Sequence, residues 1–218
     1  MRILIISILF FTGASLLSAQ NLPVGYITHF ETGFSNAKLH KHLLVSPYAQ
    51  VKVNQGVFSI IAKPDSLNSF FPPAAILVDS NIFGDYIVEL RINLSGSSQD
   101  SLDGLFLITG LRDSLNYYFV RINETGACFS RMYKGKNTEL STDSTFVINS
   151  NLWVNLRIER DILSRTFTIL SGNSKLVCTD ANLVMGYFGV GTNKNKLLID
   201  KITIWAPTSI NHGAPLFR

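Results

Sequence analysis

Short stretches in which apolar and polar residues alternate recur along the chain from Tyr26 onward. Residues 85–94 show the pattern most clearly, because every second residue from Tyr86 is apolar, whereas Glu89 and Arg91 between them are charged. An alternation with a period of two is typical of a β-strand with one buried face and one solvated face. The pattern therefore predicts a strand over 85–94.

A series of similar strands is predicted along the rest of the chain. Two short strand-like segments, 50–53 and 57–61, flank Asn54-Gln55-Gly56, which is typical of a hairpin turn. Further strands are expected over 104–109, 117–123, 127–133, 152–159, 166–170, 175–178, 187–191 and 197–205. Turn residues separate them at 123–126, 134–137 and 171–174. Many evenly spaced antiparallel strands predict an all-β protein, either a β-sandwich or a jelly roll.

The composition agrees with one well-packed domain. Of the 218 residues, 46% are hydrophobic and 16% are charged. The charged share is well below the roughly 25% of average soluble proteins, and so much apolar material excludes wholesale disorder. Two cysteines cannot form a disulfide framework, and we expect Cys128 and Cys178 to be buried free thiols, although an exported protein could pair them.

The N-terminus resembles a secretory signal peptide. Arg2 precedes the apolar run 3–11, and small residues lead to Ala19. The apolar run is shorter than the roughly 20 residues of a membrane span, which makes a membrane anchor the weaker alternative. We expect cleavage after Ala19 and a single domain over 20–218, secreted to the periplasm or the extracellular space, without a membrane span in the mature chain.

The distribution of charged residues argues against a nucleic-acid partner. The formal net charge is +4, and the basic residues are scattered between apolar and acidic ones. Binding to nucleic acid requires a concentrated basic surface, so we expect none.

A recognisable order of motifs runs from Phe83 to Trp205. It comprises Phe83–Arg91, Asp103–Phe106, Tyr117–Ile122, Leu152–Ile158, Arg165–Ile169, Gly186–Gly191 and Ile199–Ile204. This order resembles the concanavalin A-like lectin/glucanase superfamily, and within it the laminin G-like modules and the 3-keto-disaccharide hydrolase domain family of exported bacterial proteins. The resemblance implies a concanavalin A-like jelly-roll β-sandwich of two antiparallel sheets. It also implies a carbohydrate or glycoconjugate as the partner.

The chain departs from the hydrolase pattern in two places. It reads Leu102-Asp103-Gly104 where those relatives typically carry Asn-Ser-Gly, and Tyr118-Phe119-Val120 where they tend to have polar or acidic residues. The Glu-x-Asp-x-x-Glu strand of family 16 glucanases is missing from the sequence. Binding without catalysis is therefore the favoured function. The alternatives are a 3-keto-disaccharide or glycoside hydrolase-like enzyme, and a structural adhesion or protein-interaction module.

Two carboxyl groups are the best catalytic candidates. Glycoside hydrolysis uses a pair of carboxyl groups about 5–10 Å apart. Asp103, near Asp100, and Glu89, on one strand face with Arg91, could serve as acid and base. The simpler interpretation is that the aspartates solvate a loop and that Glu89 forms a surface ion pair.

Two segments could bind a sugar, which needs an aromatic face and polar groups. One contains Phe70 and Phe71, for which core packing is the alternative; the other contains Arg112, Asn116 and Tyr117, with Asp113. We expect the protein to require no cofactor. A structural calcium ion could bind Glu31 and Asp200 if the first and last strands are neighbours.

Three further expectations concern packing and loops. Trp153, at the start of an alternating strand, is expected to pack between the sheets. Gly186 is expected to allow strands to approach closely. Four Asp-Ser triplets, which begin at residues 65, 100, 113 and 143, resemble an O-glycosylation motif of exported bacterial proteins, whereas Asp and Ser are also common loop formers.

Overall fold

The computed structural model describes residues 22–34, 43–62, 74–78, 81–96, 103–182, 185–193, 196–207 and 209–211. The predicted signal peptide, the Phe70-Phe71 segment and Asp100 lie outside the described residues. The two Asp-Ser triplets that begin at residues 65 and 100 lie outside them as well.

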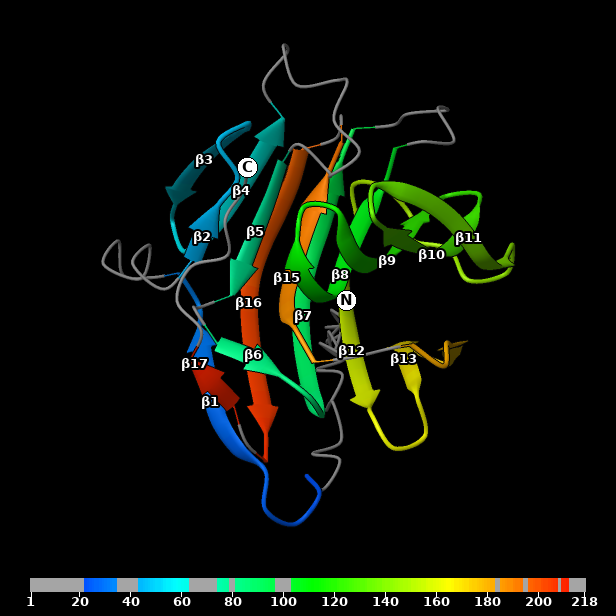
Figure 1. Ribbon diagram of the computed structural model, residues 1–218. Coiled ribbons are helices and arrows are strands. Elements are labelled where there is room, and N and C mark those ends of the chain that lie inside the picture. The colour runs from blue at the N-terminus through cyan, green and yellow to red at the C-terminus, as the bar shows by residue number, and fades with distance from the viewer. Residues whose placement is uncertain are drawn as a thin grey trace, which may run out of the picture.

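Two large sheets form the body of the protein (Figure 1). An eight-stranded sheet has the order β14 (Ser174–Thr179), β13 (Thr166–Ser171), β12 (Trp153–Asp161), β7 (Tyr86–Ser95), β16 (Lys196–Ala206), β4 (Val57–Ala62) and β3 (Ala49–Asn54), with β1 (Ile27–Thr32) also paired to β16. A seven-stranded sheet has the order β11 (Lys136–Asp143), β10 (Gly126–Tyr133), β9 (Asn116–Asn123), β8 (Leu105–Asp113), β15 (Tyr187–Thr192), β5 (Ala74–Val78) and β2 (Leu43–Val45). A small ribbon pairs β6 (Asn81–Phe83) with β17 (Ser209–Asn211).

The predicted strands are confirmed, and the described strand pairs are antiparallel. The predicted hairpin is β3–β4, in which Asn54 pairs with Val57 and leaves a two-residue turn. Gln55 and Gly56 both have positive φ, 49° and 79°. This geometry is that of the tight turn whose twist matches the flanking strands.

Among the described strands, β2, β5, β6, β11 and β17 were not predicted, and β11 is the longest of them. Residues 136–143 form β11, an edge strand of the seven-stranded sheet, although the sequence there reads as a turn followed by polar residues. Leu140 is the single apolar residue of this strand and packs against the core, so the strand has no apolar alternation to reveal it. Its pairing with β10 holds it in place instead.

The hydrophobic core lies between the two large sheets. On β7 the predicted face is correct, because Tyr86, Val88, Leu90, Ile92 and Leu94 are all buried. From the other sheet, β9 contributes Val120 and Ile122, and β15 contributes Phe188 and Val190. Cys128 and Cys178 are buried and free, as expected.

The expected position of Trp153 is wrong. Its side chain is 40% exposed and lies on the outer face of the eight-stranded sheet, where the Arg91 guanidinium stands 5.1 Å from the ring centroid. Leu156 and Ile158 of the same strand point into the core. Because side chains alternate along a strand, the odd-numbered Trp153 must face outward.

A buried polar group interrupts the core at the end of β12. Arg160 takes the inward position after Ile158, and its Nη1 donates to Thr109 Oγ1 at 3.2 Å. The Tyr86 hydroxyl donates to the same oxygen at 2.7 Å. Burial raises the pKa of Tyr86 to about 12, against the opposing effects of the Arg160 charge and the Thr109 hydrogen bond.

The expected role of Gly186 is confirmed. A Cβ atom at this position would lie 2.3 Å from the carbonyl carbon of Gly110 and 2.6 Å from its Cα. Gly110 has a φ of 59° and lies where the register between β8 and β9 shifts, between Thr109 and Asp113. Two glycines thus allow the segment before β15 to pass directly against the bulge in β8.

We predict that Gly186→Ala destabilises the protein by about 1–3 kcal/mol, because the methyl group would overpack against the backbone. Gly33→Ala is the matched control, since a Cβ there meets nothing within 4 Å. Urea denaturation of both variants measures the difference. Equal stability of the two variants would contradict the close approach.

A second prediction concerns alkaline unfolding. The pKa of Tyr86 is raised from its ordinary value near 10, so its contribution to stability is complete below pH 10 and is lost as the pH rises toward 12. Over this range the unchanged protein should lose about 2–3 kcal/mol more of its free energy of unfolding than Tyr86→Phe loses. Urea denaturation at pH 9, 10, 11 and 12 tests this, and parallel pH profiles would contradict it.

Candidate functional site

A pocket of about 620 Å³ opens at one end of the seven-stranded sheet. It is lined by the end of β8, the start of β9 and the end of β10, three strands that lie side by side in Figure 1. Asn182, which follows β14 of the other sheet, completes the lining. The pocket thus lies between the end of the seven-stranded sheet and a turn that follows a strand of the other sheet. The lining residues are Gly110, Arg112, Asp113, Asn116, Tyr117, Tyr118, Arg131, Met132, Tyr133 and Asn182.

The structure brings together the predicted group of Arg112, Asn116 and Tyr117 with Asp113. Asp113 shapes the β8–β9 turn, because its Oδ1 accepts hydrogen bonds from the Leu115 amide at 2.8 Å and from Asn116 Nδ2 at 2.9 Å. Asn116 Oδ1 in turn accepts from the Lys134 amide at 3.1 Å, and this bond ties the β8–β9 turn to the β10–β11 turn. Asn116 therefore holds the shape of the pocket.

The two Asp-Ser triplets that are described have turn roles. In the first, Asp113 forms the turn just described. In the second, Asp143 Oδ1 accepts from the Thr145 amide at 2.8 Å and from the Thr145 hydroxyl at 2.7 Å. These bonds lower the pKa of Asp143, the hydroxyl bond contributing most. Loop formation thus accounts for both aspartates, whereas glycosylation of the triplets stays a prediction.

Two adjacent tyrosines of β9 line the pocket, with their side chains on opposite faces of the sheet. Tyr117 lies on the outer face of the seven-stranded sheet against Phe119, with 5.8 Å between ring centroids, and belongs to a second apolar cluster there. Tyr118 faces the core and stacks on Phe129, also with 5.8 Å between ring centroids. Burial raises the pKa of both hydroxyls, and for Tyr118 the nearby Asp180 carboxylate adds to the rise.

An ion pair between Arg131 and Asp180 lies on the core-facing side of the pocket. Arg131 Nη1 lies 3.1 Å from Asp180 Oδ2, and Asp180 Oδ1 accepts from the Asn182 amide at 2.6 Å. Arg131 occupies an inward position on β10, two residues after the buried Phe129. Because it lies near the end of the strand, its side chain stays 27% exposed.

The rim carries the exposed groups. Tyr133, at the end of β10, is 55% exposed, and the Lys134 ammonium stands 5.2 Å from its ring centroid. Arg112, beyond the β8 bulge, is also exposed. Sequence reasoning missed Tyr118, Arg131, Tyr133 and Asn182 as pocket residues. The one signal available was Arg131 itself, a charge on the apolar face of an alternating strand.

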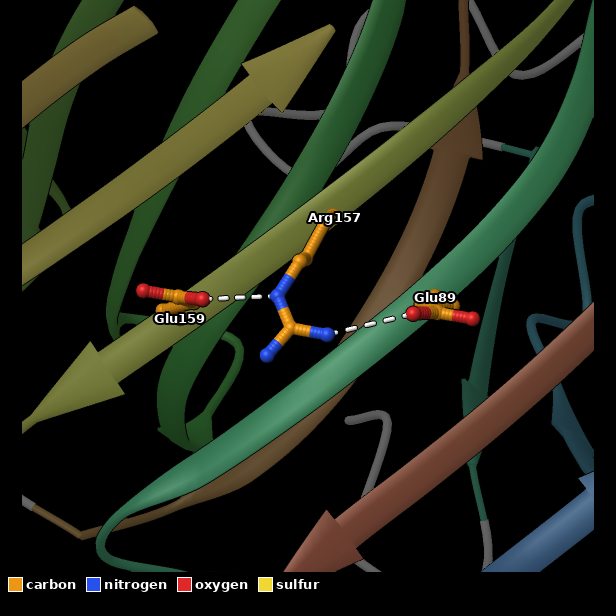
Figure 2. A network of polar contacts seen from close by, with 3 residues as sticks. All are labelled: Glu89, Arg157 and Glu159. Carbon is orange, nitrogen blue, oxygen red and sulfur yellow. Dashed lines mark hydrogen bonds and ion pairs between the residues drawn. The ribbon is translucent and has the colours of Figure 1, made fainter. Parts of the chain in front are cut away.

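The catalytic candidates Glu89 and Asp103 are not brought together. Glu89 lies on the outer face of the eight-stranded sheet, and the interpretation of it as a surface ion pair is confirmed (Figure 2). The Arg157 guanidinium stands between Glu89 Oε1, 3.1 Å from Nη1, and Glu159 Oε1, 2.7 Å from Nε (Figure 2). Arg157 comes from β12, directly opposite Glu89 in the register.

Asp103 precedes β8 of the other sheet and is buried. Its carbonyl oxygen accepts from Asn123 Nδ2 at 3.1 Å, and its carboxylate oxygens have no hydrogen-bond partner among the residues that the structure describes. It lies at the opposite end of β8 from the pocket, because the pocket residues of that strand, Gly110, Arg112 and Asp113, are at its C-terminal end. Neither candidate therefore lies in the pocket wall.

The expected calcium ligands are on neighbouring strands, since β1 pairs with β16. Glu31 Oε1 lies 3.7 Å from Lys201 Nζ, and the Asp200 carboxylate pairs with Arg91. A calcium ion would have to displace both cations to reach these carboxylates. Over the described ranges, no group of three or more His, Cys, Asp or Glu residues could hold a metal ion.

Comparison with known proteins identifies the fold. No protein-family model matches the chain, and no curated protein matches it in sequence. In structure, the chain is similar to the carbohydrate-binding module CBM66 from Bacillus subtilis, with 13% identity and a TM-score of 0.52 over 76% of this chain and 92% of that one.

Within the described residues, no helix is long and apolar enough to cross a membrane.

Two further solved structures agree. Peanut lectin in complex with a 9mer peptide shares 11% identity, with a TM-score of 0.57 over 85% of this chain and 98% of the lectin. A β-1,3-1,4-glucanase (lichenase) from a mouse hindgut metagenome shares 13% identity, with a TM-score of 0.55 over 84% of this chain and all of the enzyme, 100%. At these identities the likeness concerns the fold: the chain is a concanavalin A-like jelly-roll β-sandwich.

The ion pairs of Figure 2 lead to a prediction about stability. Arg157→Gln would leave the Glu89 and Glu159 carboxylates without the cation between them, at a cost of about 1 kcal/mol in dilute buffer. The cost should shrink in 1 M salt, where the screening length is only about 3 Å. Urea denaturation at both salt concentrations measures it, with the exposed Arg165→Gln as control. A loss that is independent of salt would mean that the arginine stem, rather than its charge, stabilises the sheet.

Proposed function

We propose that the protein is an exported carbohydrate- or glycoconjugate-binding module that holds a sugar in the pocket at the ends of β8, β9 and β10. The observation that carries the proposal is the combination of an exposed aromatic ring, Tyr133, with the polar side chains of Arg112 and Arg131 in one pocket. Sugars bind proteins through an aromatic face against the apolar side of the ring and polar groups at its hydroxyls.

The size and rigidity of the pocket support this proposal. Its volume of about 620 Å³ is in the range of small-ligand pockets, about 300–1,000 Å³. The turns around it are held by Asp113 and Asn116, so little ordering is needed when a ligand binds. The fold likeness to a carbohydrate-binding module and a lectin agrees with this function. The signal-peptide pattern at the N-terminus supports export.

Hydrolysis is the weaker alternative. A glycosidase needs two carboxyl groups on either side of one bond, whereas Glu89 pairs with Arg157 on one sheet and Asp103 precedes a strand of the other. The resemblance to the 3-keto-disaccharide hydrolase domain family is what keeps this alternative open. Turnover of a glycoside that Asp103→Asn abolishes would favour the enzyme over the binding module.

We predict that Tyr133→Ala lowers the affinity for the bound saccharide by about tenfold or more, because stacking on the exposed ring is lost. Tyr48→Ala is the matched control, since Tyr48 is 51% exposed but does not line the pocket. A glycan array identifies the saccharide, and calorimetric titration of the purified variants measures the affinity. Unchanged affinity in Tyr133→Ala would contradict binding in this pocket. Binding of a protein but of no saccharide would favour the adhesion alternative.

A further inference from the structure

We propose that the pocket selects an anionic saccharide, one that carries a carboxylate or a sulfate ester. The inference rests on the proposed function, since it names the ligand class of the same pocket. Its basis is an imbalance in the pocket: the protein itself uses the hydrogen-bond acceptors, whereas strong donors stay unused.

The carboxylates at the pocket are engaged within the protein. Both oxygens of Asp113 accept from Asn116 Nδ2, at 2.9 and 3.0 Å, and Oδ1 also accepts from the Leu115 amide. Asp180 accepts from Arg131 through one oxygen and from the Asn182 amide through the other. The side-chain oxygen of Asn116 accepts from the Lys134 amide. These oxygens are therefore poorly placed to bind sugar hydroxyls or a cation.

The hydrogen-bond donors of the two pocket arginines, in contrast, are only partly used within the protein. A guanidinium carries five N–H donors. Arg131 uses Nη1 on Asp180, and its buried Nε has no hydrogen-bond partner among the described residues. Arg112 is exposed and forms no ion pair within the described part of the chain. Among the lining residues, Arg112 and Arg131 carry positive charge and Asp113 carries negative charge.

Tyr118 adds a donor to the same wall. Its side chain is 4% exposed, and its hydroxyl lies beside Arg131 and Asp180, which both shift its pKa. Burial raises the pKa of Tyr118, and the Asp180 carboxylate adds to this rise, so the phenol keeps its proton at neutral pH and remains a donor. A buried donor without an acceptor is costly. Arg131 Nε is such a donor within the described residues, and a ligand that supplies an acceptor would recover part of this cost.

An oxyanion meets these conditions better than a neutral sugar hydroxyl. It brings several acceptor lone pairs and a negative charge, and its hydrogen bonds to a guanidinium are charge-assisted, roughly twice as strong as neutral ones. The exposed Tyr133 ring beside the arginines can contact the sugar ring that bears the anion. The pocket thus offers separate contacts for the charge and for the carbohydrate.

Calorimetric titration with three matched oligosaccharides tests the inference: oligogalacturonate, a sulfated galacto-oligosaccharide and the neutral galacto-oligosaccharide of equal length. At least one acidic ligand should bind about tenfold more tightly than the neutral one, and this preference should weaken at high salt. Preference for oligogalacturonate would identify the carboxylate as the recognised group, and preference for the sulfated ligand would identify the sulfate ester.

Three variants assign the selectivity to the pocket. Arg112→Gln should lower the affinity for the acidic ligand by about tenfold and for the neutral one by clearly less, because glutamine keeps N–H donors but loses the charge. Lys52→Gln, which removes an equal charge from β3, should change neither. Tyr118→Phe should weaken acidic binding more than neutral binding, because the hydroxyl beside Arg131 and Asp180 is lost.

The outcomes separate this inference from the proposed function. If the neutral oligosaccharide binds as tightly as the acidic ones and its binding depends on Tyr133, the proposed function stands and the anionic selectivity is wrong. If Arg112→Gln weakens all three ligands equally, the selectivity is likewise wrong. If no saccharide binds, both proposals fail.

Discussion

The burial of one face of each central strand between two sheets is the constraint on which the structure depends. Once Leu90 and Ile92 of β7 face inward, Glu89 and Arg91 must face water. The same rule applied to β10 and β12 directs Arg131 and Arg160 toward the core. Each of these arginines lies near the end of its strand, where the sandwich supplies partners such as Asp180 or Thr109. The pocket forms at one of these ends.

The fold was largely predictable because period-two alternation is a local signal. It identified β7 and the β3–β4 hairpin directly from the sequence. It failed at β11, where Leu140 is the single apolar residue, so that no alternation marks the strand and its pairing with β10 is not visible in the sequence. Trp153 was misassigned by its size and hydrophobicity, although the positions of Leu156 and Ile158 already placed it on the outer face.

The pocket was only half predictable for a related reason. Arg112, Asn116 and Tyr117 are close in sequence and meet in one turn, so their grouping was visible in the chain. Arg131, Tyr133 and Asn182 reach the same place through the pairing of β9 with β10 and through a segment that follows the other sheet. A contact between remote segments depends on strand register, which the composition of a segment does not encode.

The polar character of β11 has a consequence for how the molecules meet one another. A free sheet edge offers unpaired backbone groups to any passing strand, and natural proteins discourage such pairing with charged and polar side chains. The exposed lysine and threonines of β11 surround such an edge, one strand away from the end of β10 where Tyr133 lies. This edge therefore disfavours edge-to-edge pairing of molecules into filaments. As a result, the neighbouring pocket should stay open to solvent even in concentrated solutions.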